Sequence, residues 1–154
     1  MDTKEKAMQR AIDLSRQGLT CGGPFGAVVV RGTEIIGEGV NLVVIRRDPT
    51  AHAEINAIRD ACRFLKTHDL TGCDLYTSCE PCPMCMGAIR WARIGKVYYA
   101  ADKLDADSAG FDDYKFYNEV VGPGVSNLIE VCEAKDAARA VLTDWKALPA
   151  KRTY

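Results

Sequence analysis

The alternation of apolar and polar positions divides the chain into helical and extended stretches. Apolar residues recur at three- and four-residue steps over 2–17, which predicts an opening helix, and Asp2 with Glu5 forms a capping-box pattern at its start. A near-continuous apolar run over 26–31 predicts a strand, and a short turn separates it from a second strand over 34–40. These two strands should pair as a hairpin.

The rest of the chain alternates helical and extended patterns. We expect helices that begin near His52, Cys82 and 113 and a last helix over 135–148, strands over 73–78, 96–101 and 126–131, and loops over 41–50 and 106–110. Strands that alternate with helices after a hairpin favour one mixed sheet of five strands, with helices on both faces. The sequence therefore predicts an α/β fold, and the length of 154 residues predicts a single domain over 1–154.

The amino-acid composition indicates the cellular compartment in which the protein is expected. Hydrophobic residues make up 47% of the chain and charged residues 27%, as in ordinary soluble globular proteins, and no run approaches the roughly 20 apolar residues of a membrane span. The first residues are charged and lack the apolar stretch of a secretory signal. Seven cysteines are an odd number without framework spacing, so we expect free thiols in a reducing cytoplasm and no membrane association.

The charge balance bears on the class of partner. The net charge is −1 and the sequence pI is near 6.1, with basic residues scattered apart from pairs at 46–47 and 151–152. Nucleic-acid binding rests heavily on phosphate neutralisation and usually shows as a basic excess. A small-molecule substrate is therefore favoured over tRNA or DNA.

The strongest chemical pattern is His52 and Glu54 followed by the C-P-M-C step of Cys82 and Cys85. Zinc accepts imidazole nitrogen and thiolate sulfur, and a site with three protein ligands keeps its fourth position for water. Glu54 should project away from the ligand point, where it could take a proton from that water, whose pKa zinc lowers to roughly 7. We therefore predict one Zn²⁺ per chain on His52, Cys82, Cys85 and water, with Glu54 as the catalytic acid and base.

A structural zinc site closed by four protein ligands is the alternative. Cys73 and Cys79 lie close enough in sequence to supply the fourth ligand, which would make the chain a zinc-stabilised binding module without catalysis. Such a site gives no reason for Glu54. The order of histidine, glutamate and paired cysteines is instead the signature of zinc-dependent base deaminases.

Over nearly its whole length the chain resembles the cytidine deaminase superfamily, and within it the small bacterial guanine deaminases. The resemblance rests on P-F-G-A-V-V-V at 24–30, the asparagine at 41, H-A-E-I-N-A-I-R at 52–59, C-E-P-C-P-M-C at 79–85, G-A-I-R-W-A-R at 87–93 and A-G-F-D-D at 109–113. The last two segments, with Trp91 and 110–113, are what separate the guanine enzymes from tRNA adenosine deaminases. The resemblance implies a cytidine-deaminase-like three-layer sandwich.

It further implies hydrolytic deamination of a free aminopurine, with guanine giving xanthine and ammonia. A tRNA adenosine deaminase, or a guanosine or aminotriazine (ammeline-type) deaminase, is the alternative. Carried over by position, the amide of Asn41 and the backbone N–H of Ala53 would bind the purine, Phe25 and Trp91 would wall it, Asp113 would face its amino-bearing edge as a second catalytic group, and Tyr154 would close the pocket. The resemblance also implies a homodimer that exchanges the segment from about 134 to 154, so that Tyr154 would serve the partner's site.

These substrate contacts have plainer interpretations on the residues alone. Asn41 follows a strand and is by itself typical of a turn, while Phe25 and Trp91 are typical of a core. Asp112 or Asp113 would ordinarily cap a helix, and we expect one of them to cap and the other to point into the pocket.

Overall fold

The computed structural model describes residues 2–124, 126, 128, 130–150 and 153, and the chain divides into two units. The first unit, residues 1–124, contains the sheet and the whole predicted metal motif. The second unit, residues 125–154, contains α7 (Lys135–Ala147), the last helix that the sequence predicts. The assignment of 1–154 to a single domain stays a prediction. No helix in the described part of the chain is both long and apolar enough to cross a bilayer.

The first unit is built around a mixed sheet of four strands. These are β1 (Gly23–Arg31), β2 (Glu34–Asn41), β3 (Cys73–Cys79) and β4 (Lys96–Ala101), in the order β2-β1-β3-β4. β1 is antiparallel to both β2 and β3, as the predicted hairpin requires, and β3 is parallel to β4.

The predicted fifth strand over 126–131 is wrong for the residues that can be assessed. Positions 127 and 129 lie outside the described residues, and 126, 128, 130 and 131 are not in a strand. A strand needs a neighbouring strand for its backbone N–H and C=O groups. The described residues of the second unit offer none, so the β-prone composition of this segment has no ladder to join.

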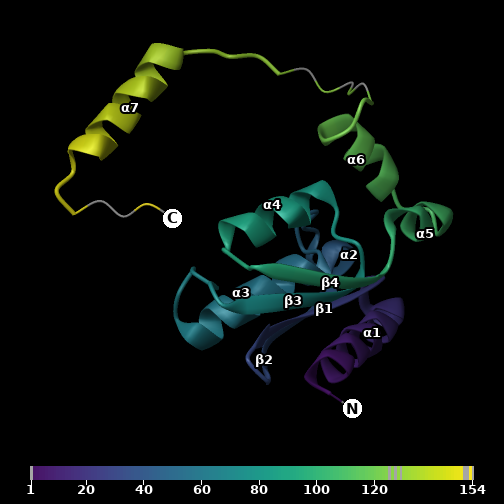
Figure 1. Cartoon of the computed structure of the whole chain (residues 1–154). Helices are drawn as coiled ribbons and strands as arrows, with labels where there is room; N and C mark the ends of the chain where they lie inside the picture. The colour runs from purple at the N-terminus through teal and green to yellow at the C-terminus, as the bar shows by residue number, and fades with distance from the viewer. Residues whose placement is uncertain (1, 125, 127, 129, 151–152, 154) are drawn as a thin grey trace. The chain divides into compact units, whose positions relative to one another are not determined.

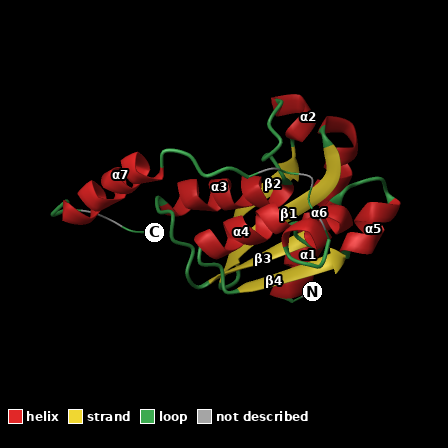
Figure 2. Cartoon of the chain, turned by 90° about the horizontal axis from the view of Figure 1, so that it is seen from above, coloured by secondary structure: helices red, strands yellow, loops and turns green. Residues whose placement is uncertain are grey.

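Helices cover both faces of the sheet and form the predicted sandwich. α1 (Thr3–Cys21) lies on one face, and α3 (Ala53–Leu65) with α4 (Pro83–Trp91) lies on the other (Figures 1 and 2). The capping box at Asp2 and Glu5 is present, and α1 continues past the predicted end at 17. The fold class is therefore confirmed, with one strand fewer than predicted.

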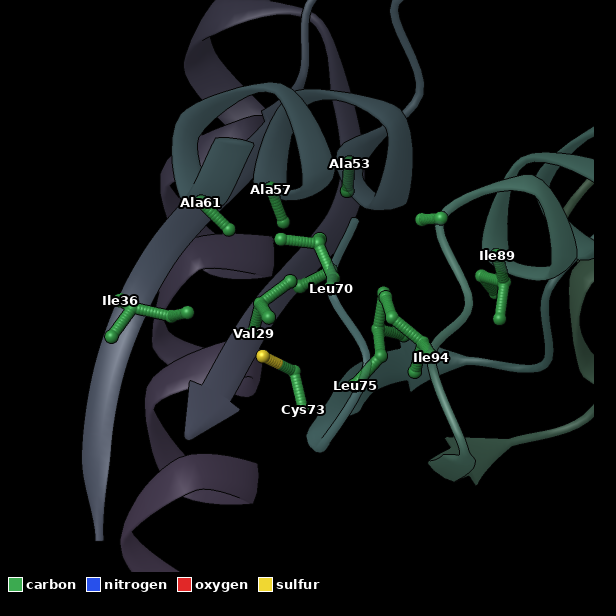
Figure 3. Close-up of a cluster of buried hydrophobic side chains, with 12 residues drawn as sticks. Val29, Ile36, Ala53, Ala57, Ala61, Leu70, Cys73, Leu75, Ile89 and Ile94 are labelled. Carbon is green, nitrogen blue, oxygen red and sulfur yellow. The ribbon is translucent and has the colours of Figure 1, made fainter. Parts of the chain in front are cut away.

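Alternate residues of the central strands supply the two cores. On β1, Val28 and Val30 pack toward α1, whereas Ala27 and Val29 pack toward α3. Figure 3 shows this second cluster, in which Leu70 and Leu75 join the alanines of α3. Apolar residues face both ways because both faces of these strands are covered by helices.

The close approach of α3 to β2 fixes the position of the metal motif. A Cβ on Gly39 of β2 would come within 2.0 Å of the carbonyl oxygen of Ala53 and 2.5 Å of the backbone nitrogen of Ala57. Any side chain at position 39 would therefore push the first turn of α3 away from the sheet. That turn begins directly after His52.

Two helices occupy segments that we predicted as loops. α2 (Val43–Arg46) falls within 41–50, and α5 (Lys103–Ser108) overlaps 106–110. Asp102 caps α5 in a second capping box, a pattern that was readable in the sequence. α6 (Asp113–Val120) is the predicted short helix. The start of β1 lies beside the ends of β2, β3 and β4. The predicted site forms at this end of the strands.

Candidate metal centre and active site

Two helix N-termini supply the proposed ligands. His52 is the N-cap residue of α3 and Cys82 is that of α4, and both have extended backbone geometry with no side-chain capping hydrogen bond. Their side chains are therefore not used by their own helices. Pro83 begins α4, where its missing N–H costs nothing, and places Cys85 in the same first turn.

The three side chains converge as a metal site requires. Nδ1 of His52 lies 3.6 Å from Sγ of Cys82 and 3.6 Å from Sγ of Cys85, and the ligand atoms of all three lie within 4.8 Å of one another. Tetrahedral zinc, with bonds of about 2.3 Å to sulfur and about 2.1 Å to nitrogen, places nitrogen and sulfur about 3.6 Å apart. The donor set and its spacing therefore fit zinc, with Nδ1 as the imidazole ligand.

The cysteines that would have closed a four-ligand site do not join the cluster. Among the described residues, the cluster contains His52, Cys82 and Cys85, and neither Cys73 nor Cys79 belongs to it. The thiol of Cys79 instead donates to the carbonyl oxygen of Asp102 at 3.5 Å. Burial raises the pKa of Cys79 to about 12, which keeps it a neutral thiol rather than a ligating thiolate.

The two ligand cysteines differ in pKa, and the thiolate form is favoured for only one of them. The pKa of Cys82 is lowered to about 4, first by a hydrogen bond from the Cys85 thiol and then, against the effect of burial, by the bond to His52. The pKa of Cys85 is raised, because it holds the proton shared with Cys82 and is buried. Metal binding must therefore displace the Cys85 proton.

Glu54 lies beside the cluster and is almost wholly buried, with 6% of its surface exposed. Its Oε1 accepts a hydrogen bond from the hydroxyl of Thr77 at 3.2 Å, and its Oε2, 3.5 Å from Sγ of Cys85, is an alternative to Cys82 as acceptor for the single hydrogen of that thiol. Burial raises the pKa of Glu54, which suits a group that must both take and release a proton.

A cavity of about 170 Å³ opens onto this carboxylate and the cluster. Pockets for drug-sized ligands measure roughly 300–1,000 Å³, so this one suits a compact molecule. Six residues predicted for the site line it: Phe25, Asn41, His52, Glu54, Cys82 and Asp113.

Other predicted contacts lie away from this cavity. Trp91 stands at the end of α4 with 62% of its surface exposed, and it is not among the lining residues. Ala53 is fully buried at the start of α3 and does not line the cavity either. Tyr154 lies outside the described residues. Contacts of these three residues with a substrate stay predictions.

Asn41 is held with its amide group toward the cavity. Its Oδ1 accepts a hydrogen bond from the backbone N–H of Val43 at 3.2 Å. A side-chain amide has two N–H donors besides that oxygen. The bond to Val43 therefore uses the oxygen of the Asn41 amide and not its NH₂ group.

The two aspartates at the start of α6 differ in environment. Asp113 is the first helical residue and lines the cavity, and its pKa is raised, chiefly by burial. Asp112 occupies the N-cap position, but its side chain makes no capping hydrogen bond. Asp112 thus stands at the capping position, as expected of one of the two aspartates, but its side chain does not bond to the helix.

Several residues of this site were not predicted from the sequence, and three of them make contacts that bear on its chemistry. Phe111 lines the cavity and packs edge to face on Phe25, with ring centroids 4.8 Å apart. Glu80 also lines it and pairs with Lys103 at 3.1 Å. Both stand inside motifs that we quoted, so the signal was present but not assigned. Thr77, which bonds Glu54, carried no such signal.

Comparisons with known proteins bear on this geometry. The family model described as the cytidine and deoxycytidylate deaminase zinc-binding region matches residues 1–101. A guanine deaminase of Bacillus subtilis is 52% identical over 127 residues, which cover 81% of each chain. A tRNA-specific adenosine deaminase of Haemophilus influenzae is 40% identical over 139 residues, covering 85% of this chain and 79% of the relative.

The same similarity holds for solved structures. The X-ray structure of guanine deaminase from Bacillus subtilis superposes with a TM-score of 0.86 at 44% identity, covering 97% of this chain and 98% of that one. The likeness thus spans both the metal motif and the segment around Phe111 and Asp113.

Proposed function

The chain belongs to the cytidine and deoxycytidylate deaminase family of zinc-binding proteins, and on this premise we propose that it hydrolyses guanine to xanthine and ammonia. The observation that carries the proposal is the meeting of two carboxylates, Glu54 and Asp113, in one small cavity beside the zinc ligands. A family relative of high identity with this activity, Bacillus subtilis guanine deaminase, supports guanine as the substrate.

The metal, when held by His52, Cys82 and Cys85, would supply a Lewis acid that makes water nucleophilic near neutral pH. Glu54 takes a proton from the attacking water and delivers it to the ring nitrogen beside the reacting carbon. Glu54 then takes the second proton from the hydroxyl now on that carbon and passes it to the amino group, so that the carbon–nitrogen bond breaks and ammonia leaves. Oxygen replaces nitrogen on the ring, so atoms and charge balance.

Asp113 and Asn41 would hold the base. Guanine presents a ring N–H and a 2-amino group on one edge, both of which donate hydrogen bonds, and a carboxylate such as Asp113 accepts from that edge. Adenine would leave the carboxylate unpaired, at a cost of about 1–3 kcal/mol or more for a charged group. The NH₂ group of Asn41 can donate to a purine acceptor, while Phe25 and Phe111 supply aromatic surface.

We also propose a homodimer that exchanges the segment from about 134 to 154, with Tyr154 closing the partner's pocket. What supports it is α7 and the residue after it, since Val141, Leu142, Trp145 and the C-cap residue Leu148 are exposed. An apolar stripe of this kind ordinarily packs against another element. The cytoplasmic location stays a prediction.

Mixed subunits would test the exchange. Glu54→Gln subunits with an intact tail would be combined with subunits that lack Tyr154 but keep Glu54. If the tail acts on the partner's site, the mixed dimer recovers activity that neither parent shows. If the tail acts on its own chain, or Tyr154 is dispensable, mixing restores nothing beyond the parents.

Ammonia release from a panel of substrates tests the activity itself. The panel contains guanine, guanosine, adenine, cytosine, cytidine, ammeline and adenosine-bearing tRNA. We expect guanine to be the best substrate. Activity on tRNA alone would favour the activity of the Haemophilus influenzae relative, and inactivity on every member would favour the binding module.

A further inference from the structure

Thr77 is a fully buried polar residue in the middle of an apolar layer. It lies on β3, where the alternate residues Cys73 and Leu75 belong to the core beneath α3, and 0% of its surface is exposed. A buried hydroxyl without a partner is costly, and valine would fill the same space without that cost. The hydroxyl is therefore kept for what it binds.

Two acceptors lie within reach of that hydroxyl. Oγ1 of Thr77 is 3.2 Å from Oε1 of Glu54 and 3.0 Å from the carbonyl oxygen of Cys79. A threonine hydroxyl has one hydrogen, so it donates to one acceptor at a time. Whenever Glu54 is ionised, its carboxylate is the stronger acceptor, because it is charged.

The second oxygen of Glu54 has a different partner. Oε2 lies 3.5 Å from Sγ of Cys85 and is an alternative acceptor for its thiol. Cys85 is one of the three proposed ligands, and a ligating cysteine is a thiolate with no hydrogen to donate. Of these two side-chain donors to Glu54, the one that persists with the metal held is Thr77.

We propose that Thr77 is a positioning residue, which anchors Oε1 of Glu54 and so leaves Oε2, beside Cys85, as the oxygen that moves protons. This inference rests on the proposed deaminase activity. When Oε1 is held in place, the carboxylate group cannot rotate, and the position of Oε2 is therefore fixed as well. A proton carrier that must reach both water and substrate depends on that orientation.

A matched pair of variants isolates the hydroxyl. Thr77→Ser and Thr77→Ala both remove the γ-methyl group, and only the serine keeps the donor. We expect Thr77→Ala to lower kcat for guanine about 10- to 100-fold, as loss of a supporting partner typically does, with KM and zinc content unchanged. Thr77→Ser should restore most of kcat.

A control separates positioning from packing. Val29→Ala opens a cavity in the same core on the neighbouring strand without touching Glu54, and it should lower the melting temperature but not kcat. If Thr77→Ala does not accumulate folded, Thr77→Val, which matches the shape of threonine, takes its place with the same expected loss.

The outcomes distinguish this inference from the activity on which it rests. An active wild type in which Thr77→Ala and Thr77→Ser have equal kcat, or in which Val29→Ala loses as much kcat as Thr77→Ala, overturns the role of Thr77 alone. A zinc-loaded wild type that releases no ammonia from guanine overturns the proposed function, and the role of Thr77 falls with it.

Discussion

Gly23 and Asn41 face each other across β1 and β2, and a side chain on Gly23 would press against the amide of Asn41. The two residues are register partners, and a Cβ on Gly23 would lie 3.1 Å from both Cγ and Oδ1 of Asn41. Carbon atoms in good contact are about 3.5–4.0 Å apart. The orientation of an amide that lines the cavity therefore depends on glycine at position 23.

Gly23→Ala should accordingly weaken substrate binding. The added methyl group would push the Asn41 amide out of place and cost about one hydrogen bond, or 0.5–1.5 kcal/mol, which is roughly a 2- to 10-fold rise in KM for guanine. We expect a smaller effect on kcat. Gly87→Ala is the control, because a Cβ there meets nothing within 4 Å. Equal KM values for the two variants would contradict the role of Gly23.

Glu54→Gln should keep zinc and lose nearly all turnover. The amide has the same shape but cannot carry the proton, and general acid–base groups contribute roughly 10²- to 10⁴-fold. Because Glu54 is used twice in the proposed reaction, the loss should lie at the upper end or beyond. Metal analysis and steady-state kinetics on the same sample decide it. Full zinc occupancy with a near-normal rate would remove Glu54 from the mechanism.

The zinc ligands could be predicted from the sequence because their signals are local. His52 and Cys82 are each the N-cap residue of a helix, and Pro83 marks the start of the second helix directly. The hydrophobic spacing after each residue fixes the helix that carries it. Once the two helix N-termini are known, only a few residues at each of them can supply a metal ligand.

Thr77 and the position of Trp91 could not be predicted in this way. A β-branched residue in a strand is what packing alone would select, so Thr77 looks ordinary until Glu54, distant in sequence, is placed against it. Trp91 was assigned by resemblance, and the local pattern does not state which side of α4 it occupies. Both depend on contacts between elements, which periodicity does not specify.

Replacement of single cysteines should separate ligands from neighbours. Cys82→Ala or Cys85→Ala should lose the metal and much of the soluble protein, because binding energy at a site that joins two helices is partly folding energy. Cys79→Ala should keep one zinc per chain, since its thiol bonds the Asp102 carbonyl and lies outside the cluster. Zinc content per chain is the measurement. A Cys79→Ala protein without metal would support a closed four-ligand site.

Asp113→Asn should reduce guanine turnover without reducing thermal stability. Burial raises the pKa of Asp113, so its charged form is less favourable in the folded protein than in the unfolded chain. Stability is therefore lost as the pH rises from the ordinary value of 3.8 through the raised value. Asparagine cannot ionise, so the Asp113→Asn variant does not lose this stability as the pH rises. Melting at pH 7 should show the variant at least as stable as the wild type.

The pH dependence and the neighbouring aspartate test this assignment together. The stability difference between Asp113→Asn and the wild type should shrink as the pH is lowered below 3.8, because Asp113 then becomes protonated in the unfolded chain as well as in the folded protein. Asp112→Asn should change neither kcat/KM nor melting appreciably, since Asp112 makes no capping bond and does not line the cavity. An Asp113→Asn protein that melts early but deaminates guanine at an unchanged kcat/KM would make Asp113 a structural residue. Recognition of the guanine edge would then fall to other groups around Asn41.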